Sequence, residues 1–447
     1  MKLYNTLTKQ KEEFVPIHDK KVNMFACGPT VYDFLHIGNG RTAITMDTLA
    51  RLLKYLGYDV NYIMNITDID DKIIKRAQES NTSWKDLTQK FEKQYLLDMK
   101  GLNVHADKYV RATDHIKDII KQVLTLLDKD FAYTIDNDGI YFEISKFKDY
   151  GKLSGRSDIK KDDAQSRVDH SDHKRGWNDF ALWKFKRGDD PSWEAPFGEG
   201  RPGWHIEDTA ITEHYFGPQY DIHGGGSDLI FPHHEAELTQ MEAASGKIPF
   251  VKYWVHGGLL YTSGERMGKS NNNFLTIHEV LEKYDANTVR LFMLSAHYRS
   301  QLNFSEEQLE ASQHRVNRWL SIADLLHQEL NSKDNPDFDL KVVEIVTALE
   351  DDLNTPKAIA VVEEIFSNVE TISTNQLKKL LEILDEILGI KLDSKDIDKE
   401  QKDLLAKRQI AKESKNYELS DEIRSELKKL GIEIKDRGDG QIWSRIR

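Results

Sequence analysis

The chain has 447 residues, of which 39% are hydrophobic and 31% charged, with a formal net charge of -13 and one cysteine. This length suggests roughly three domains of ~150 residues, and the lone cysteine excludes a disulfide framework and suits a reducing compartment. The first residues lack the apolar stretch of a signal peptide, and no apolar run approaches the ~20 residues that span a membrane. The negative charge argues against indiscriminate polyanion binding, but it is compatible with a basic face on one domain.

The first predicted unit is a strand, a glycine turn and a helix. Residues 22–27 read as a strand that stops at Gly28-Pro29, and an apolar helical pattern follows over residues 41–56. Such a turn aims free backbone N–H groups at an anion, usually a phosphate. A lone cysteine is most often a small buried apolar residue. Because Cys27 lies at the mouth of this turn, we interpret it instead as a metal ligand or a reactive thiol.

A second buried strand is predicted at residues 60–66, after which Asp68 or Asp70 could cap a helix. The stretch 107–201 has a different character. It holds a predicted helix at 116–127, short strands near Tyr133 and at 140–144, and a polar segment rich in His and Lys at 160–175. We interpret this stretch as a module inserted between two halves of one α/β domain.

The second half of the chain becomes helical. Strands and glycine turns are predicted over 204–260, amphipathic helices over 305–388, a charged linker over 392–400, a helix at 419–430, and short strands near Ile432 and Ile442. From residue 401 to the end, 12 Lys and Arg oppose 9 Asp and Glu. This tail is either an ordinary solvated surface or a polyanion contact in which Trp443 stacks on an unpaired base.

Two motifs suit phosphate chemistry. His36-Ile-Gly-Asn39 lies at the start of the helix after Cys27, where donors could neutralise charge that develops during nucleotidyl transfer. The alternative is a polar helix start without a ligand. Glu265-Arg-Met-Gly-Lys-Ser270 offers two cations, a glycine and a serine, as in a mobile phosphate clamp. Taken alone, this second motif is more often a basic surface turn.

Three further motifs could bind a nucleoside, a metal or a substrate. His223-Gly-Gly-Gly-Ser-Asp228 combines close backbone approach with a carboxylate that can hold ribose hydroxyls, or it is a hinge with a capping aspartate. His233 and Glu237 lie four residues apart, so on a helix they could chelate one ion or form a surface pair. Gly203-Trp-His-Ile-Glu-Asp208 gathers an aromatic ring, a histidine and carboxylates before a helix, and is uninformative by itself.

Together these segments resemble the cysteinyl-tRNA synthetases, a family of class I aminoacyl-tRNA synthetases. The resemblance runs from Leu3-Tyr-Asn-Thr6 to the Trp443 tail, and it includes residues 65–71 and 295–303. In the family, residues 36–39 correspond to the "HIGH" motif and residues 266–270 to the "KMSKS" loop. The resemblance implies ATP-dependent activation of L-cysteine to cysteinyl-adenylate, followed by transfer to the 3′ end of the cysteine tRNA.

The resemblance also implies roles for individual residues. The catalytic positions are His36, Asn39, Arg266 and Lys269. The ATP and adenylate contacts are Gly28, Thr30, Thr42, Asn65, Thr67, Gly226, Ser227, Asp228 and Lys269. The amino-acid pocket comprises Trp204, Thr67 and His233, and Trp443 is the tRNA contact.

The implied cofactors are one Zn²⁺ per chain and Mg²⁺ with ATP. The family's zinc ligands correspond to Cys27, Asp208, His233 and Glu237, although position 208 is usually a cysteine. Aspartate is a legitimate zinc ligand, but the loss of a softer donor should weaken affinity and favour harder ions. Arg266 and Gly268 replace the family's usual lysine and serine. Because both cations of the loop persist, we expect activity, and Gly268 should make the loop more flexible.

The expected fold class is α/β, with a class I Rossmann-type catalytic domain that contains a parallel sheet and an insertion, followed by a helical bundle and a small mixed C-terminal domain. The expected boundaries are 1–115 and 201–260 for the catalytic halves, 116–200 for the insertion, 261–308 for a stem-contact segment, 309–392 for the bundle and 400–447 for the anticodon domain. The implied partners are tRNA(Cys), ATP and L-cysteine, in a cytoplasmic monomer without a membrane contact. Two alternatives stay open: a ligase that joins cysteine to a small-molecule amine, and an inactive RNA-binding paralogue.

Overall fold

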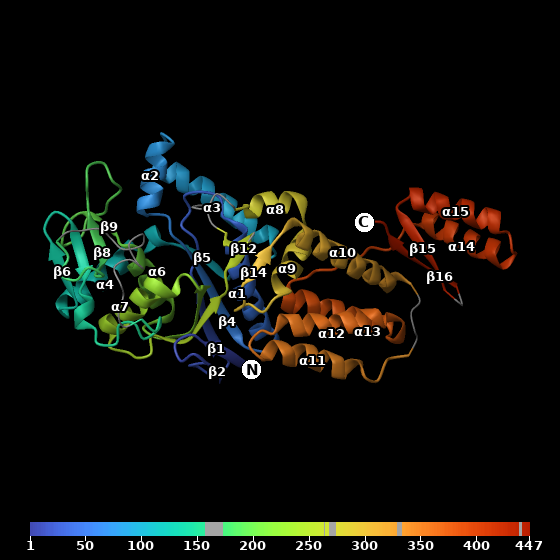
Figure 1. Cartoon of the computed structure of the whole chain (residues 1–447), viewed down its shortest axis with the longest axis horizontal. Helices are drawn as coiled ribbons and strands as arrows, with labels where there is room; N and C mark the ends of the chain where they lie inside the picture. Colours follow the sequence, from blue (N-terminus) through green and yellow to red (C-terminus); the bar gives the residue numbers. More distant parts are fainter. Residues whose placement is uncertain (157–172, 263, 268–273, 329–332, 438–439) are drawn as a thin grey trace. The chain divides into compact units, whose positions relative to one another are not determined.

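The computed structural model describes residues 1–156, 173–262, 264–267, 274–328, 333–437 and 440–447 (Figure 1). The chain divides into two compact units. The first comprises residues 1–285, 296–304 and 350–353, and the second comprises residues 286–295, 305–349 and 354–447. Within the described ranges, no helix combines the length and the apolar character that crossing a lipid bilayer requires.

A parallel sheet of five described strands forms the centre of the first unit. Its order is β11-β10-β3-β4-β5. The strands are β3 (Lys21–Ala26), β4 (Asp59–Ile66), β5 (Lys108–Arg111), β10 (Tyr220–Gly226) and β11 (Val251–Gly257). Met24 of β3 pairs with Ile222 on one side and with Tyr62 on the other. All seven residues of β10 are buried, as is typical of strands that are covered on both faces of a parallel sheet.

Helices supply the crossovers that parallel strands require. They are α1 (Ile37–Tyr55) between β3 and β4, α2 (Asp71–Glu79) and α3 (Trp84–Gly101) between β4 and β5, α6 (Trp204–Phe216) before β10, and a π-helical turn (Ile230–His234) with α7 (Glu235–Ser245) between β10 and β11. Asp70 is the residue that caps α2, because its side chain accepts the N–H of Lys72 at 2.9 Å. Asp68 instead bonds to Thr113.

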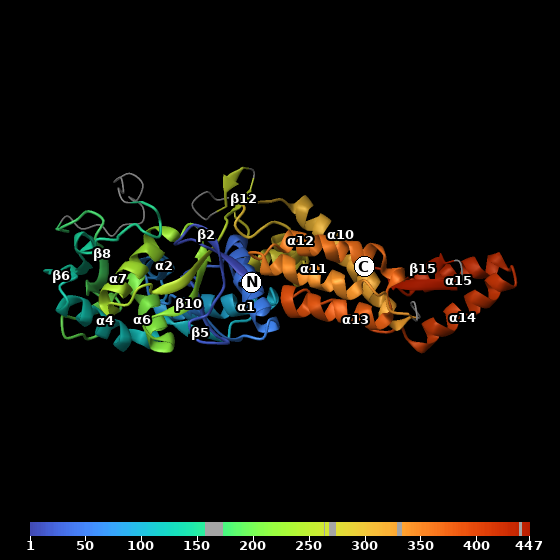
Figure 2. The same ribbon diagram turned by 90° about the horizontal axis from the view of Figure 1, so that it is seen from below.

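The segment between β5 and α6 forms a module of its own. A 3-10 turn (Ala112–His115) leads into α4 (Ile116–Asp128), and α4, α6 and α7 lie side by side (Figures 1 and 2). An antiparallel sheet follows, with the described strands β6 (Ala132–Ile135), β7 (Gly139–Phe142), β8 (Phe180–Phe185) and β9 (Gly200–Pro202). One apolar core joins α4, this sheet and α6. Most of the polar segment at 160–175 lies outside the described residues.

Smaller elements complete the first unit. They are the pair β1 (Lys2–Asn5) and β2 (Gln10–Glu13), the 3-10 turn Ile144–Lys146, the sheet of β12 (Leu260–Thr262), β13 (Glu265–Arg266) and β14 (Leu302–Phe304), and α8 (Ile277–Lys283). A capping box between Thr276 and Glu279 begins α8.

The second unit is mainly helical in the residues that the structure describes. Its helices are α9 (Ala286–Leu294), α10 (Glu306–Ala323), α11 (Phe338–Glu350, whose last residue falls in the first unit), α12 (Thr355–Ser367), α13 (Thr374–Ile383), α14 (Lys399–Glu413) and α15 (Tyr417–Lys429). Shorter turns are Asp324–His327, Val369–Thr371 and Leu384–Leu388, and the hairpin is β15 (Ile432–Arg437) with β16 (Gly440–Arg445).

Trp443 belongs to the core of the C-terminal domain. Its side chain packs with Leu404, Leu427 and Ile434, and only 5% of the residue is exposed. Its main chain also exchanges hydrogen bonds of 2.8 and 2.9 Å with the side-chain amide of Gln328. Stacking on a base requires an accessible aromatic face. The structure therefore assigns Trp443 a packing role and does not support the predicted stacking contact.

The expected α/β fold class with its parallel sheet is confirmed, whereas two expectations for single segments were wrong or incomplete. Residues 204–260, expected as strands and glycine turns, also contain α6 and α7. The helix α14 was not predicted, because most of its residues are charged or polar and only Leu404, Arg408 and Ala411 are buried. The domain boundaries proposed from the sequence stay predictions.

The contact between Asp68 and Thr113 makes the stability of the first unit depend on pH. It is buried, and its carboxylate accepts the N–H of Thr113 at 3.0 Å and also the Thr113 hydroxyl. Burial raises the pKa of Asp68 to about 6, although both hydrogen bonds favour the ionised form. Since an unfolded aspartate has a pKa of about 3.9, the native state holds more protons between these values. The stability that Asp68 contributes is therefore present below about pH 4 and is lost as the pH rises through 6.

We predict that Asp68→Asn removes this pH dependence. Relative to the wild type, the free energy of unfolding of the variant should rise by about 2 kcal/mol between pH 4 and pH 7, on top of a constant loss from the altered bonds to Thr113. Urea unfolding at both pH values measures the difference. Asp59→Asn, at an exposed residue of β4 that is not among the charges acting on Asp68, is the matched control. Parallel pH profiles of wild type and Asp68→Asn would contradict the prediction.

Candidate active site and metal-ligand cluster

The candidate site lies where the order of the sheet reverses. The chain adds β4 and β5 on one side of β3, and then adds β10 and β11 on the other side. In open α/β sheets, ligands bind at such a switch point, beyond the carboxyl ends of the strands. Here β3 ends at Ala26, β4 at Ile66 and β10 at Gly226. A cavity of about 590 Å³ opens at this edge.

The structure brings most of the predicted site residues together. Those that line the cavity are Cys27, Gly28, Thr30, His36, Asn39, Thr42, Trp204, Gly226 and Asp228. Those that are buried nearby in the same unit are Asn65, Thr67, Asp208, His233 and Glu237. The N–H of Ser227 donates to the carbonyl of Gly257 at 2.8 Å. The main chain of Arg266 belongs to β13, and Lys269 lies outside the described residues.

The amino end of α1 faces the cavity. His36 precedes the helix in an extended conformation, with φ -79° and ψ 154°, and the N–H of Asn39 donates to its carbonyl at 2.9 Å. The positive end of the helix dipole favours an anion at this position. Because α1 has 19 residues, its amino end is suited to a phosphate group.

Gly28 lets the turn after β3 approach β4 closely. A Cβ at this position would lie 1.8 Å from the carbonyl oxygen of Asn65, so no larger residue fits. The N–H of Gly28 donates to Asn65 Oδ1 at 2.5 Å, and Thr30 forms a parallel bridge with Thr67. These contacts fix the turn against the end of β4.

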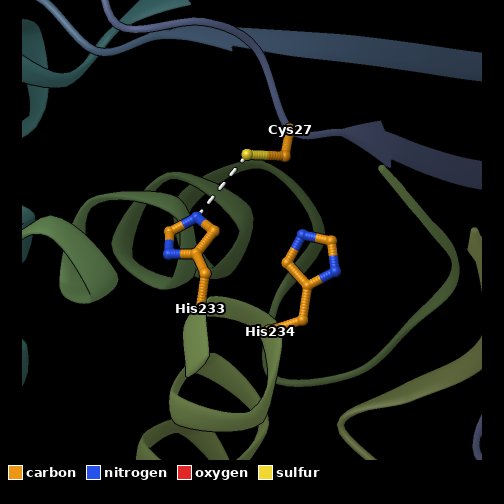
Figure 3. Close-up of side chains that lie close together, drawn as sticks. All are labelled: Cys27, His233 and His234. Carbon is orange, nitrogen blue, oxygen red and sulfur yellow. Dashed lines mark hydrogen bonds between the residues drawn. The ribbon is translucent and has the colours of Figure 1, made fainter. Parts of the chain in front are cut away.

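Four potential metal ligands meet beside the cavity. Cys27 follows β3, Asp208 lies on α6, and His233 and Glu237 lie one turn apart around the start of α7. Nε2 of His233 is 3.0 Å from Glu237 Oε1, 3.2 Å from Asp208 Oδ2 and 3.5 Å from Cys27 Sγ, the last contact being drawn in Figure 3. A single imidazole nitrogen therefore faces one sulfur and two carboxylates.

The His233 ring is held from its other sides. Trp204 stacks on it with ring centroids 4.1 Å apart and planes inclined by 8°. Nδ1 of His205 lies 2.9 Å from Nδ1 of His233, so one of these two atoms carries the proton between them. When Nε2 of His233 acts as a ligand, its Nδ1 donates to His205, and this contact selects the tautomer.

Asn65 connects the glycine turn to the donor cluster. Its Nδ2 donates to Asp208 Oδ1 at 2.5 Å, while its Oδ1 accepts the N–H of Gly28. Oδ1 of Asp208 is thereby engaged, and Oδ2 is the oxygen that faces His233. The orientation of the Asp208 carboxylate follows from this amide.

The electrostatics of the cluster favour a cation. Burial raises the pKa of the Cys27 thiol well above its ordinary value, and the charges of Asp208 and Glu237 raise it further. Burial also raises the pKa of Glu237 to about 7, against the opposing effect of His233. Burial disfavours the His233 imidazolium, but Glu237 and Asp208 outweigh this effect and raise the His233 pKa to about 9. A cation at the centre of the cluster would therefore stabilise the ionised forms of Cys27, Asp208 and Glu237.

The donor set fits a zinc ion. Tetrahedral zinc has bonds of ~2.0–2.3 Å to S, N and O donors, which places neighbouring donors roughly 3.3–3.7 Å apart. The three contacts of His233 Nε2 span 3.0 to 3.5 Å. The buried Glu237 carboxylate has only imidazole nitrogens as polar partners among the described residues, the nearest being His233 Nε2 at 3.0 Å and His223 Nε2 at 3.6 Å. Since buried carboxylates are costly without a compensating charge, an ion bound to Glu237 would stabilise its ionised form.

His234 lies next to the cluster, but its nitrogens face other histidines. Its Nδ1 is 2.7 Å from His256 Nε2, and its Nε2 is 3.3 Å from His223 Nε2. Burial lowers the pKa values of His223 and His234 well below the ordinary range and lowers that of His256 to about 3. These three rings are therefore neutral. His234, drawn beside His233 in Figure 3, is a neighbour of the four candidate ligands and not one of them.

Sequence reasoning missed two kinds of functional neighbour. His205 stands in the motif that seemed uninformative by itself, and only the packing of α6 against His233 gives it a role. Lys184 and Arg201 line the cavity from the inserted module, where both pair with Asp71 at the start of α2. No spacing rule links residues so far apart in the chain, so no sequence signal could have found them.

Comparisons with known proteins identify the family of this chain. Residues 13–314 match the family "tRNA synthetases class I (C) catalytic domain", residues 344–393 match the DALR domain, and residues 394–443 match the "Cysteinyl-tRNA ligase anticodon binding domain". The cysteine–tRNA ligase of Clostridioides difficile (strain 630) is 43% identical over 470 residues, covering 100% of both chains. That of Thermococcus onnurineus (strain NA1) is 43% identical over 480 residues, covering 100% of this chain and 99% of the relative.

Solved structures show the same fold at low sequence identity. A Mycobacterium tuberculosis methionyl-tRNA synthetase in complex with methionyl-adenylate has a TM-score of 0.58 and 14% identity, covering 84% of this chain and 86% of that chain. A LeuRS of Agrobacterium radiobacter K84, in a ternary complex, has a TM-score of 0.63 and 12% identity, covering 85% of each chain. With its catalytic-domain match over residues 13–314 and full-length relatives at 43% identity, this chain belongs to the cysteine–tRNA ligase family of class I tRNA synthetases.

Proposed function

We propose that this chain activates L-cysteine with ATP to give cysteinyl-adenylate and pyrophosphate, and then transfers the cysteinyl group to the 3′ end of tRNA(Cys). One observation carries the proposal: the sulfur-, nitrogen- and oxygen-donor cluster around His233 adjoins the cavity that the amino end of α1 faces. A site for a thiol-bearing substrate thus lies beside a site for a phosphate. Mg²⁺ would accompany ATP, and the enzyme would work as a monomer in the cytoplasm.

The phosphate side of the proposed reaction rests on α1 and the turn after β3. The positive end of the α1 dipole, together with His36 and Asn39, would stabilise the charge that develops on the α-phosphate as the carboxylate of cysteine attacks it. Gly28, which lines the cavity, holds the turn against Asn65 at this point. Asp228, which follows β10 and lines the cavity, is placed to accept hydrogen bonds from ribose hydroxyls.

The amino-acid side rests on Cys27, Asp208, His233 and Glu237, which we propose as ligands of one Zn²⁺. Cysteine and serine differ by sulfur for oxygen, so a pocket that reads only shape discriminates poorly between them. A zinc ion held there would supply a Lewis acid that lowers the pKa of a thiol and binds the thiolate, whereas an alcohol stays protonated. Trp204, stacked on His233 and lining the cavity, would form the wall against which the substrate lies.

The tRNA side rests on the second unit. Residues 394–443 match an anticodon-binding family, and the tail from residue 401 has more basic than acidic side chains. Because Trp443 is buried, we propose that the basic side chains of α14 and α15, and not the indole, contact the RNA backbone. No feature of the described residues favours a small-molecule amine as the acceptor.

We predict cysteine-dependent exchange of pyrophosphate into ATP, with little exchange in the presence of serine. His36→Ala should lower the exchange rate by ~10²–10³, the usual effect of removing one donor to a developing charge. His18→Ala, on an exposed loop, is the matched control and should behave as the wild type. An absence of cysteine-dependent exchange, or equal rates with serine, would refute the proposed activity.

Asn65→Ala should weaken Zn²⁺ binding by ~10–100-fold, because the carboxylate of Asp208 loses the amide that orients it. Competition with a chromophoric chelator measures the affinity without any substrate. Asn61→Ala, four residues earlier on β4 and bonded to Asn23, is the control. If both variants bound Zn²⁺ as the wild type does, Asn65 would have no role in positioning the ligand.

Asp208→Cys should shift the metal preference of the site. A thiolate is a softer donor than a carboxylate, so the affinity for Zn²⁺ should rise relative to that for Mn²⁺ or Mg²⁺. Parallel titrations of the wild type and the variant with Zn²⁺ and Mn²⁺ give the ratio. An unchanged ratio would mean that residue 208 does not contact the ion.

A further inference from the structure

A second group of potential metal ligands lies in the first unit, and it shares no residue with the cluster around His233. His115 ends the 3-10 turn before α4, Asp118 lies in the first turn of α4, and His214 lies in the last turn of α6. One donor atom from each residue lies within 4.8 Å of the other two. This cluster plays no part in the activity proposed above.

The three side chains converge on one carboxylate oxygen. Oδ2 of Asp118 is 2.8 Å from His115 Nδ1 and 3.2 Å from His214 Nδ1. The two imidazole rings are edge to face, with centroids 4.8 Å apart. Donors on a common zinc ion are roughly 3.3 Å apart, given bonds of ~2.0–2.2 Å. Small rotations of these side chains would therefore place both Nδ1 atoms and the carboxylate on one ion.

The residues that present these ligands are firmly supported. Ile119, Val123 and Leu126 bury one face of α4 in the core that it shares with α6. Gln122 joins the helices further, because its Nε2 donates to Glu213 at 3.0 Å and its Oε1 accepts the hydroxyl of Thr209 at 2.6 Å. Ligands on packed helices keep their relative positions, as a metal site requires.

The cluster is open to solvent on one side. The side chain of His214 is 47% exposed and that of Asp118 is 35% exposed, whereas that of His115 is 7% exposed. Tyr215 packs against both imidazoles, with centroids 5.5 Å from His115 and 4.9 Å from His214. An ion could enter from the exposed side, where water would complete its coordination.

We propose that His115, Asp118 and His214 form a second metal site, specific for a late divalent transition ion such as Zn²⁺. Two imidazoles and one carboxylate are the donors that suit such ions, while Mg²⁺ and Ca²⁺ prefer oxygen alone. The bound ion links the start of α4 in the inserted module to the end of α6. His214 lies six residues after Asp208 on the same helix, about 9 Å along its axis, so the two ions occupy separate positions.

Titration of the full-length, metal-stripped protein with Co²⁺ tests the proposal. The wild type should bind two equivalents. Binding of Co²⁺ at Cys27 (the first event) gives a thiolate-to-cobalt charge-transfer band. Binding at the second site (the second event) gives ligand-field bands without sulfur character. His214→Ala and Asp118→Asn should each abolish the second event and leave the first unchanged. His18→Ala, which removes an exposed histidine elsewhere in the unit, should retain both.

Two results would overturn the proposal. The first is a wild type that shows only the thiolate-containing event, in which case the three residues form a hydrogen-bonded cluster alone. The second is a sulfur-free event that persists in both His214→Ala and Asp118→Asn, because the ion would then lie elsewhere. Cysteine-dependent pyrophosphate exchange by the variants shows that they are folded. Because this exchange tests the proposed function and the Co²⁺ titration tests the second site, the two proposals can fail independently.

Discussion

The contact of one imidazole nitrogen with three acidic side chains is the constraint on which the catalytic unit depends. The half-buried Cys27 and the buried Asp208 and Glu237 all face Nε2 of His233. Like-charged groups in such a place repel one another and lose their hydration, so they are tolerated only with a compensating charge. Cys27 directly follows β3, and Asp208 and Glu237 lie near the starts of α6 and α7, so the ends of these three elements converge on His233. The packing of these elements can be understood as the means of holding that geometry.

The surrounding contacts reduce the freedom of every member of the cluster. Trp204 and His205 fix the ring plane and the tautomer of His233, and Asn65 fixes one oxygen of Asp208. Asn65 also accepts the N–H of Gly28, so the turn beside the amino end of α1 shares a hydrogen-bond partner with a candidate metal ligand. A displacement of Asp208 would therefore be felt at the proposed phosphate site. Activation of an amino acid requires both reacting groups in register, and this shared amide couples their positions.

The sequence predicted the elements whose signals are local. The strands at residues 22–27 and 60–66, the helix after Gly28 and the capping position next to α2 all follow from periodicity and from turn chemistry. The pairing of His233 with Glu237 follows from helical spacing. Contacts that depend on tertiary packing could not be predicted in this way. His205 and Asn65 acquire their roles from residues 28 and 143 positions away, and the burial of Trp443 depends on apolar residues of α14, α15 and β15 that only the fold brings beside it. The missed helix α14 has few apolar residues, and its buried Arg408 pairs with Asp436 on the hairpin, which no helical pattern reveals.

With an aspartate at position 208, Cys27 is the only sulfur donor among the four proposed ligands, which determines how they respond to oxidation. In a site with two cysteines, loss of the ion allows the two thiols to form a disulfide, which can no longer bind the ion. Cys27 is the only cysteine in the chain, so no intramolecular disulfide can form. Oxidation of the emptied site stops first at a sulfenic acid, which thiols reduce. Further oxidation gives a sulfinic acid, which thiols do not reduce, so a lone cysteine lacks the reversible protection that a disulfide would supply.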